Sequence, residues 1–222
     1  MNTAKSNFFH VETIRTPRVY FSDNFSEETR EIWLIIHGYG QLAGRFIEKF
    51  GTLIGNQTAL AVPEAMQRFY LDGPHNKVGA SWMTREDRET DIADNHRYLN
   101  RVIEEIRVKT KKEPVWRILA FSQGTATACR WLAQSNISPA SLTLWAGMWP
   151  EDIDGQDLSS KLKSTQCFWI LGNDDPYYHS DMLKKQQSLL ESWNIEPEVI
   201  SFEGGHHIDE PTLQLLLQRI TS

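Results

Sequence analysis

Residues 115–133 read VWRILAFSQGTATACRWLA and contain the local pattern that decides the fold. The first five residues are typical of a buried strand, and the residues after Gly124 favour a helix. Between them, Ser122 falls on a sharp turn flanked by Ala120 and Gly124, whose small size lets a strand and a helix pack closely. Such a turn exposes the hydroxyl of Ser122. It also directs the free N–H groups of the helix toward a point where negative charge can form.

The pentapeptide AFSQG alone leaves a simpler interpretation open. Serine is a favoured residue at the N-cap of ordinary helices, where its hydroxyl accepts a backbone hydrogen bond. The choice between a capping serine and a nucleophile therefore depends on which polar groups the rest of the chain brings to the same place.

Composition restricts the class of protein. The chain has 222 residues, of which 40% are hydrophobic, and a formal net charge of −6, so we expect a single domain over residues 1–222. The acidic balance argues against a nucleic-acid partner. The basic run at residues 109–112 lies where a helix is expected to end, and cations suit that end of the helix dipole.

No apolar stretch is long enough for stable membrane insertion, and the N-terminus lacks the apolar core of a signal peptide. The two cysteines, Cys129 and Cys167, have neither a disulfide framework nor metal-ligand spacing. We therefore expect a cytoplasmic protein without a metal site. The oligomeric state is left open by the sequence.

The remaining hydrophobic patterns predict strands that alternate with helices. Strands are expected at residues 8–14, 18–21, 31–36, 58–62, 115–119, 141–145, 166–171 and 198–202. Helices are expected at residues 42–53, 87–108, 125–133, 180–193 and 212–220. Residues 66–86 form a long irregular stretch, and loops of that length are usually functional or mobile. The alternation predicts an α/β fold with a mostly parallel central sheet and helices on both faces.

Polar residues follow several of these strands at the point where each strand ends. They are His37-Gly38-Tyr39-Gly40, Ser122, Asp174-Asp175 and His206-His207. Because the carboxyl ends of parallel strands share one edge, where ligands bind in such sheets, these residues are expected to meet there. Serine, acid and histidine also follow one another in the order seen in one large class of serine hydrolases.

On these motifs the chain resembles the phospholipase/carboxylesterase branch of the α/β-hydrolases, which includes acyl-protein thioesterases and small bacterial esterases. The matching segments are residues 36–40, 121–124, 171–176 and 204–206, and the chain departs from the G-x-S-x-G pattern only at Ala120. The resemblance implies the α/β-hydrolase fold. It also implies hydrolysis of carboxylic esters or thioesters through an acyl-serine intermediate, without a cofactor.

The resemblance assigns the nucleophile to Ser122 and the acid to Asp175, which lies three residues after Gly172 and directly before Pro176. Asp174 remains the alternative acid, and as a turn residue it also has an ordinary structural explanation.

The family histidine directly follows a glycine, which selects His206 over His207. The resemblance further implies an oxyanion hole built from the backbone N–H groups of Tyr39 and Gln123. The side chain of Gln123 is not needed for that role. His37 is expected to stabilise the oxyanion loop.

Aromatic and sulfur-containing side chains in loops near this sheet edge are candidates for an apolar substrate groove. They are Trp82, Met83, Met148, Trp149 and Tyr177. Packing beneath the loops explains them equally well.

The leading hypothesis is a serine hydrolase that cleaves small to medium acyl esters or thioesters. Lysophospholipase activity uses the same catalytic residues and remains an alternative. A hydrolase fold that has lost catalysis and serves as a binding protein is the alternative from another class.

Overall fold

The computed structural model of the chain describes residues 7–221. Its centre is a sheet of seven strands in the order β1-β3-β2-β6-β7-β8-β9. These strands are β1 (Val19–Phe21), β2 (Glu31–Ile36), β3 (Thr58–Pro63), β6 (Val115–Phe121), β7 (Ser141–Trp145), β8 (Gln166–Gly172) and β9 (Glu198–Phe202). Strand β1 is antiparallel to β3, and the other pairs are parallel. The predicted α/β-hydrolase type of sheet is therefore confirmed.

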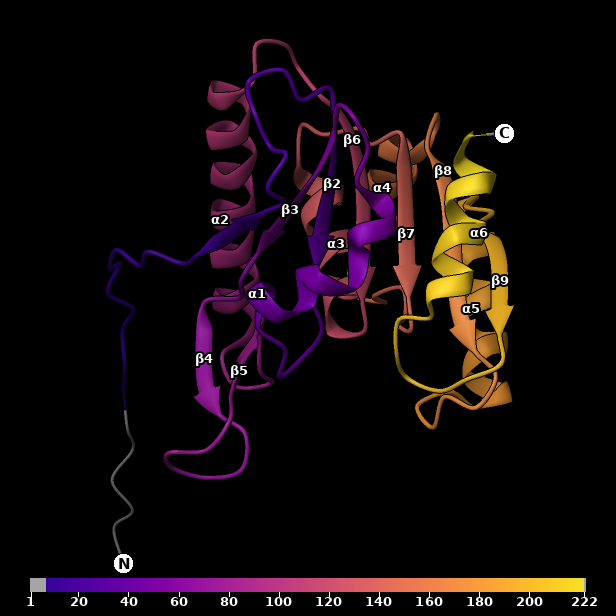
Figure 1. Cartoon of the computed structure of the whole chain (residues 1–222). Coiled ribbons are helices and arrows are strands. Elements are labelled where there is room, and N and C mark those ends of the chain that lie inside the picture. The colour runs from indigo at the N-terminus through magenta and orange to yellow at the C-terminus, as the bar shows by residue number, and fades with distance from the viewer. Residues whose placement is uncertain (1–6, 222) are drawn as a thin grey trace, which may run out of the picture.

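Helices cover both faces of this sheet (Figure 1). One face packs against α2 (Arg88–Lys109), α3 (Gln123–Gln134), α4 (Gly155–Leu162) and α5 (Ser180–Trp193). The other face packs against α1 (Ala43–Phe46), the 3-10 helix η1 (Ile47–Leu53) and α6 (Glu210–Thr221).

The sequence of β2 does not alternate between apolar and polar residues, because the strand is buried on both faces. Ile32, Leu34 and Ile36 belong to the core on the α2–α3 face, whereas Trp33 and Ile35 belong to the core on the opposite face. Successive side chains of a strand point to opposite faces, so a strand covered on both sides is apolar at almost every position.

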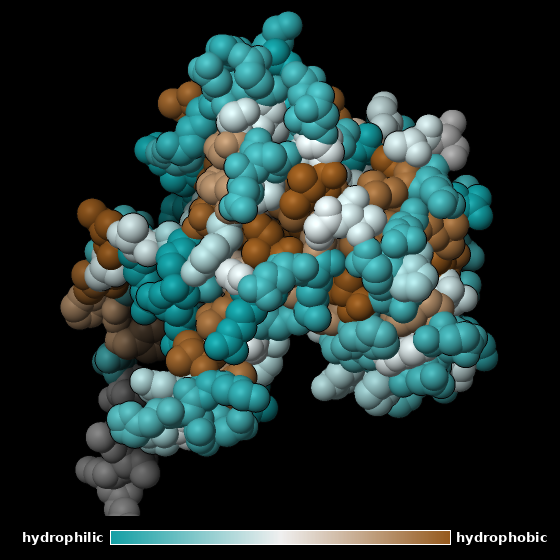
Figure 2. Space-filling model, in the orientation of Figure 1, coloured by the Kyte–Doolittle hydropathy of each residue, from teal (hydrophilic) through white to brown (hydrophobic). Residues whose placement is uncertain are grey.

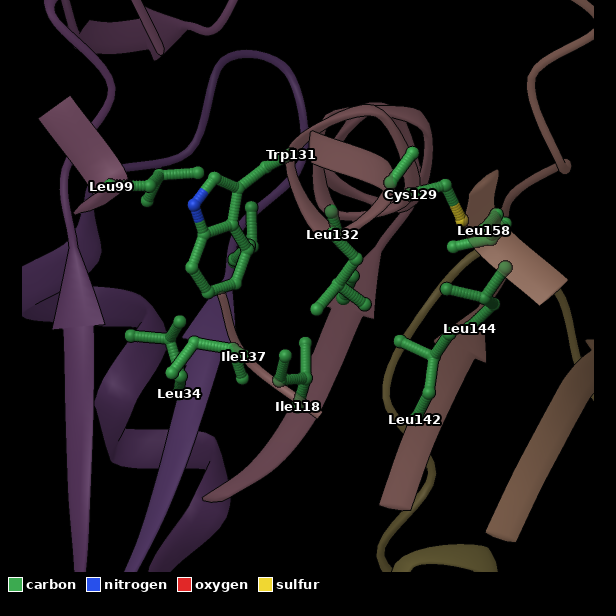
Figure 3. Close-up of a cluster of buried hydrophobic side chains, with 14 of the residues drawn as sticks. Leu34, Leu99, Ile118, Cys129, Trp131, Leu132, Ile137, Leu142, Leu144 and Leu158 are labelled. Carbon is green, nitrogen blue, oxygen red and sulfur yellow. The ribbon is translucent and has the colours of Figure 1, made fainter. Parts of the chain in front are cut away.

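The larger core lies between the sheet and helices α2 and α3. Figure 3 shows Trp131 and Leu132 projecting from α3 toward Leu99, Ile118 and the neighbouring core residues. The indole of Trp131 is fully buried, yet its Nε1–H donates a 2.8 Å hydrogen bond to Asn100 of α2. This bond satisfies the one polar group that the packing would otherwise leave unpaired.

Two parts of the N-terminal half differ from the sequence-based expectation. The strand predicted at residues 8–14 is wrong, because this segment is exposed and pairs with no strand among residues 7–221. The helix predicted at residues 42–53 is divided into α1 and η1, and the backbone of Phe50 leaves helical geometry.

Residues 66–86 are more ordered than expected. They contain a hairpin of β4 (Gln67–Tyr70) and β5 (Val78–Ser81), with Phe69 opposite Gly79. Strand β4 has no buried residue, so its sequence has no hydrophobic strand signal. Helix α4 was also absent from the expected elements, because its eight residues give too short a pattern to recognise.

The carboxyl ends of β6, β7, β8 and β9 lie at one edge of the sheet, because these strands are parallel. Figure 1 shows the arrowheads of β7, β8 and β9 at the lower edge of the sheet, with the β4–β5 hairpin beside the same edge. In the space-filling view this edge is hollowed between the part carrying the hairpin and the part carrying β8 and β9 (Figure 2).

We predict that Gly124→Ala destabilises the protein by about 1–3 kcal/mol, the usual cost of overpacking. A Cβ on Gly124 would lie 2.5 Å from the carbonyl oxygen of Ile36 and 2.7 Å from that of His37, so backbone must move. Gly51→Ala is the matched control, because a Cβ there meets nothing within 4 Å. Urea unfolding of both variants measures the difference, and equal stabilities would refute the proposed crowding.

Candidate active site

The turn between β6 and α3 has strained backbone at Ser122. Its φ is +53° and its ψ is −119°, a region that residues with a side chain rarely adopt. The N–H of Ser122 donates to the carbonyl oxygen of Trp145 at 2.9 Å, which ties the turn to β7. Ala120 lies within extended β6, so its Cβ is accommodated and a glycine is not required there.

Three side chains from distant parts of the chain form one hydrogen-bonded series. His206 Nε2 lies 2.8 Å from Ser122 Oγ, and His206 Nδ1 lies 2.7 Å from Asp175 Oδ2. A carboxylate can only accept, so Nδ1 carries the proton and Nε2 accepts from the serine hydroxyl in the neutral imidazole. This is the arrangement that a histidine base needs in order to remove the serine proton.

The two candidate acids are distinguished by geometry. The carboxylate of Asp175 is fully buried, and its second oxygen accepts the N–H of Tyr177 at 3.0 Å. Asp174 is exposed, and its backbone N–H donates to Gly204 across the loop. Only Asp175 reaches the imidazole of His206.

The two adjacent histidines also differ. The ring of His206 is enclosed between Phe121 and Tyr177, with centroid distances of 5.0 and 4.7 Å. The ring of His207 packs edge-on against Phe202 instead, at 5.4 Å. Phe121 directly precedes the serine, so the turn itself supplies one wall of the imidazole site.

The loop after β2 approaches the serine closely. A Cβ on Gly38 would lie only 3.1 Å from the Cβ of Ser122, so a side chain at this loop position would crowd the serine. Gly40 has a φ of +74°, a conformation that glycine adopts without strain.

Most backbone N–H groups of this loop donate hydrogen bonds within the protein. Gly38 N–H donates to Gln41 Oε1, Gly40 N–H to Ala80 and Gln41 N–H to Gly38. Within the described residues, the N–H of Tyr39 has no hydrogen-bond partner. The first N–H groups of α3, beginning at Gln123, also lack partners within their own helix. These groups are therefore available to an anion beside Ser122.

The side chain of Gln123 has contacts that the sequence did not reveal. Its Oε1 accepts from the backbone N–H of Trp82 at 3.0 Å, and its Nε2 donates to the carbonyl oxygen of Met83 at 2.9 Å. The Gln123 amide is thus bound to the segment that follows β5. No local sequence pattern predicts a contact across 40 residues.

The five residues expected to line an apolar groove differ in exposure. Trp82 and Trp149 are fully buried, so they offer no surface to a substrate, and packing beneath the loops accounts for both. Met83 and Met148 are partly exposed, and Tyr177 is well exposed beside His206.

A groove of about 1020 Å³ lies between residues 10–21 and α2, and neither Ser122 nor His206 lines it. Because it holds none of the hydrogen-bonded triad, we assign the chemistry to the strand edge. No group of three or more metal-ligating side chains occurs within residues 7–221. Over the same range, no helix is both long and apolar enough to cross a membrane.

A serine at a strained strand–helix turn, hydrogen-bonded to a histidine and an acid at the edge of a parallel sheet, defines an α/β-hydrolase. The sequence matches the serine hydrolase family FSH1 over residues 28–218, and the chain belongs to that family. The prediction of a serine hydrolase is therefore confirmed. No curated protein sequence matches the chain.

Solved structures share the fold at low sequence identity. A carboxylesterase from Mesorhizobium loti is 17% identical with a TM-score of 0.71, and the match covers 93% of this chain and 94% of that one. Acyl-protein thioesterase 2 from Zea mays is 14% identical with a TM-score of 0.69, covering 93% and 98%. The carboxylesterase from Bacillus cereus is 15% identical with a TM-score of 0.66, covering 92% and 93%.

His37 supports the loop after β2 as a neutral, fully buried side chain. Its Nδ1–H donates to the carbonyl oxygen of Gly38 at 2.8 Å, and its Nε2 accepts from the N–H of Ala65 at 3.0 Å. Burial lowers the pKa of His37 from 6.5 to about 4. A protonated ring cannot accept from Ala65, so acid opposes this arrangement.

We predict a matching pH dependence of stability. Between about pH 6.5 and pH 4, His37 is protonated in the unfolded chain but stays neutral in the folded protein. The free energy of unfolding is therefore unaffected by this group above that pH and falls by about 3 kcal/mol as pH drops to about 4. Urea unfolding of the wild type and of His37→Gln at several pH values isolates the contribution of His37, because glutamine does not titrate. If the two proteins lose stability in parallel, His37 is not the group responsible.

Proposed function

We propose that this serine hydrolase cleaves carboxylic esters or thioesters of small to medium acyl groups through an acyl intermediate on Ser122. The observation that carries the proposal is the hydrogen-bonded series from Asp175 through His206 to Ser122 Oγ, with distances of 2.7 and 2.8 Å.

In this mechanism His206 Nε2 takes the proton of Ser122 as its oxygen attacks the acyl carbonyl carbon. Asp175 keeps the proton on Nδ1 and stabilises the imidazolium. The imidazolium then protonates the leaving alkoxide or thiolate as its bond to the acyl carbon breaks. Water attacks the acyl-enzyme by the same route, and Ser122 recovers its proton.

The negative charge of the tetrahedral intermediate needs fixed donors. The N–H groups of Tyr39 and Gln123 are the proposed pair. Gln123 directly follows Ser122, Tyr39 follows Gly38, which approaches Ser122 closely, and the neighbouring loop donors are occupied. A donor that is already oriented stabilises the intermediate without a cost of reorganisation during the reaction.

The substrate class is proposed from the site and from similar proteins. Structures named as carboxylesterases and an acyl-protein thioesterase share the fold over more than nine-tenths of this chain. Tyr177 is 65% exposed beside His206 and is the best-placed apolar surface for an acyl or leaving group. Met83 and Met148 complete the proposed substrate contacts.

We further propose that the chain works as one domain in the cytoplasm on a small-molecule acyl substrate. Cys129 and Cys167 are both free thiols, as expected in a reducing compartment.

Replacing Ser122 with alanine is predicted to abolish ester hydrolysis while the fold is retained. Loss of the nucleophile costs about 10⁶ in kcat in a comparable triad enzyme. The assay is hydrolysis of p-nitrophenyl esters of increasing chain length, with fluorophosphonate labelling as the direct measure of the nucleophile. Wild-type protein that takes no label would show a hydrolase fold without catalysis, and cleavage of lysophosphatidylcholine alone would point to a lysophospholipase.

The other two triad members have matched neighbours as controls. Asp175→Asn is predicted to lower kcat by up to about 10⁴ by favouring the wrong imidazole tautomer, whereas Asp174→Asn has a small effect. His206→Ala is predicted to be nearly inactive and His207→Ala to stay active. Steady-state kinetics of the four variants decide the assignment. The reverse ranking within either pair would move the role to the neighbouring residue.

A further inference from the structure

The segment from Ala80 to Trp82 binds both sides of the proposed oxyanion hole. Ala80 exchanges two backbone hydrogen bonds with the loop after β2, accepting from Gly40 N–H at 2.8 Å and donating to Gln41 at 3.2 Å. These bonds fix the residues that directly follow Tyr39.

Trp82 extends the same connection. Its indole Nε1–H donates to the carbonyl oxygen of His37 at 2.8 Å, two residues before Tyr39. Its backbone N–H donates to the side chain of Gln123 at 3.0 Å, on the helix that supplies the other N–H group. Trp82 is thus hydrogen-bonded both to the loop after β2 and to Gln123 of α3.

The buried surroundings make these bonds rigid. Trp82 is 0% exposed, and its indole lies against the ring of His37 at a centroid distance of 5.1 Å. The remaining backbone oxygen of Trp82 accepts from Asn95 of α2 at 2.6 Å. A buried polar group without a partner is costly, so each of these bonds resists breaking.

We propose that the side chains of Gln123 and Trp82 form a brace that sets the spacing between the Tyr39 and Gln123 N–H groups. The inference rests on the proposed function. Both side chains are positioning residues, because neither touches the reacting atoms. Gln123 then has two separable roles: its backbone N–H faces the oxyanion and its side-chain amide holds the brace.

The size of the effect follows from the geometry that catalysis demands. Oxyanion donors work only within hydrogen-bond distance of the developing charge, and a displacement of about 1 Å can cost about 10²-fold in rate. A loosened brace keeps both donors but misplaces them. We therefore expect a loss of about 10- to 100-fold in kcat, smaller than removal of the nucleophile.

Gln123→Met tests the brace most directly. Methionine has similar length and leaves the backbone N–H in place, but it can neither accept from Trp82 nor donate to Met83. Trp82→Phe is the second variant and removes the bond from the indole to His37. Gln187→Met, at an exposed position of α5, is the matched control for the same chemical change.

The readouts separate positioning from general destabilisation. For both brace variants we expect kcat for p-nitrophenyl butyrate to fall about 10- to 100-fold with KM within about threefold. The inhibition constant of butylboronic acid, which forms a tetrahedral anion on serine, is expected to rise by a similar factor. The midpoint of the pH–rate profile should not move, because the contacts of His206 with Ser122 and Asp175 are unchanged.

Folding is checked by circular dichroism, and if one brace variant does not fold, the other carries the test. Folded variants with kcat within twofold of wild type overturn the inference. A loss of kcat without weaker boronate inhibition, or with a shifted pH midpoint, also overturns it. Wild-type protein that takes no fluorophosphonate label overturns the proposed function as well, so the two failures are distinguishable.

Discussion

The close packing of the β6–α3 turn against the end of β2 is the constraint on which the site depends. Gly124 lies against the carbonyl oxygens of Ile36 and His37 with no space for a Cβ. This contact forces the sharp turn that holds Ser122 at a φ of +53°. The strain at one residue is sustained because strand, helix and neighbouring loop are each fixed by a buried core.

The parallel sheet then concentrates the chemistry. Strands β6, β8 and β9 end at the same edge, so Ser122, Asp175 and His206 meet although 84 residues separate the serine from the histidine. Helices on both faces keep the strand ends from moving relative to one another. The result is a 2.8 Å hydrogen bond between His206 Nε2 and Ser122 Oγ.

Neutral buried side chains hold the backbone of the loop after β2 in place. His37 and Trp82 are both fully buried, and each donates a ring N–H to a backbone carbonyl oxygen of the loop after β2. The amide of Gln123 joins them from the helix side. These side chains are uncharged. They hold the proposed backbone donors in fixed positions, and fixed donors are the source of electrostatic stabilisation in such sites.

The sequence by itself determined the alternating elements, the turn at Ser122 and the order of the polar clusters, because hydrophobic period and turn residues are local properties. It left Asp174 open as the acid, and only the buried carboxylate of Asp175 at 2.7 Å from His206 distinguishes the two. Tertiary structure also decided the hairpin at residues 67–81, the burial of the two loop tryptophans and the contacts of the Gln123 amide. The burial of the tryptophans and the contacts of Gln123 depend on residues far apart in the chain, about which local patterns carry no information. The hairpin is local, but β4 has no buried residue and therefore no hydrophobic strand signal.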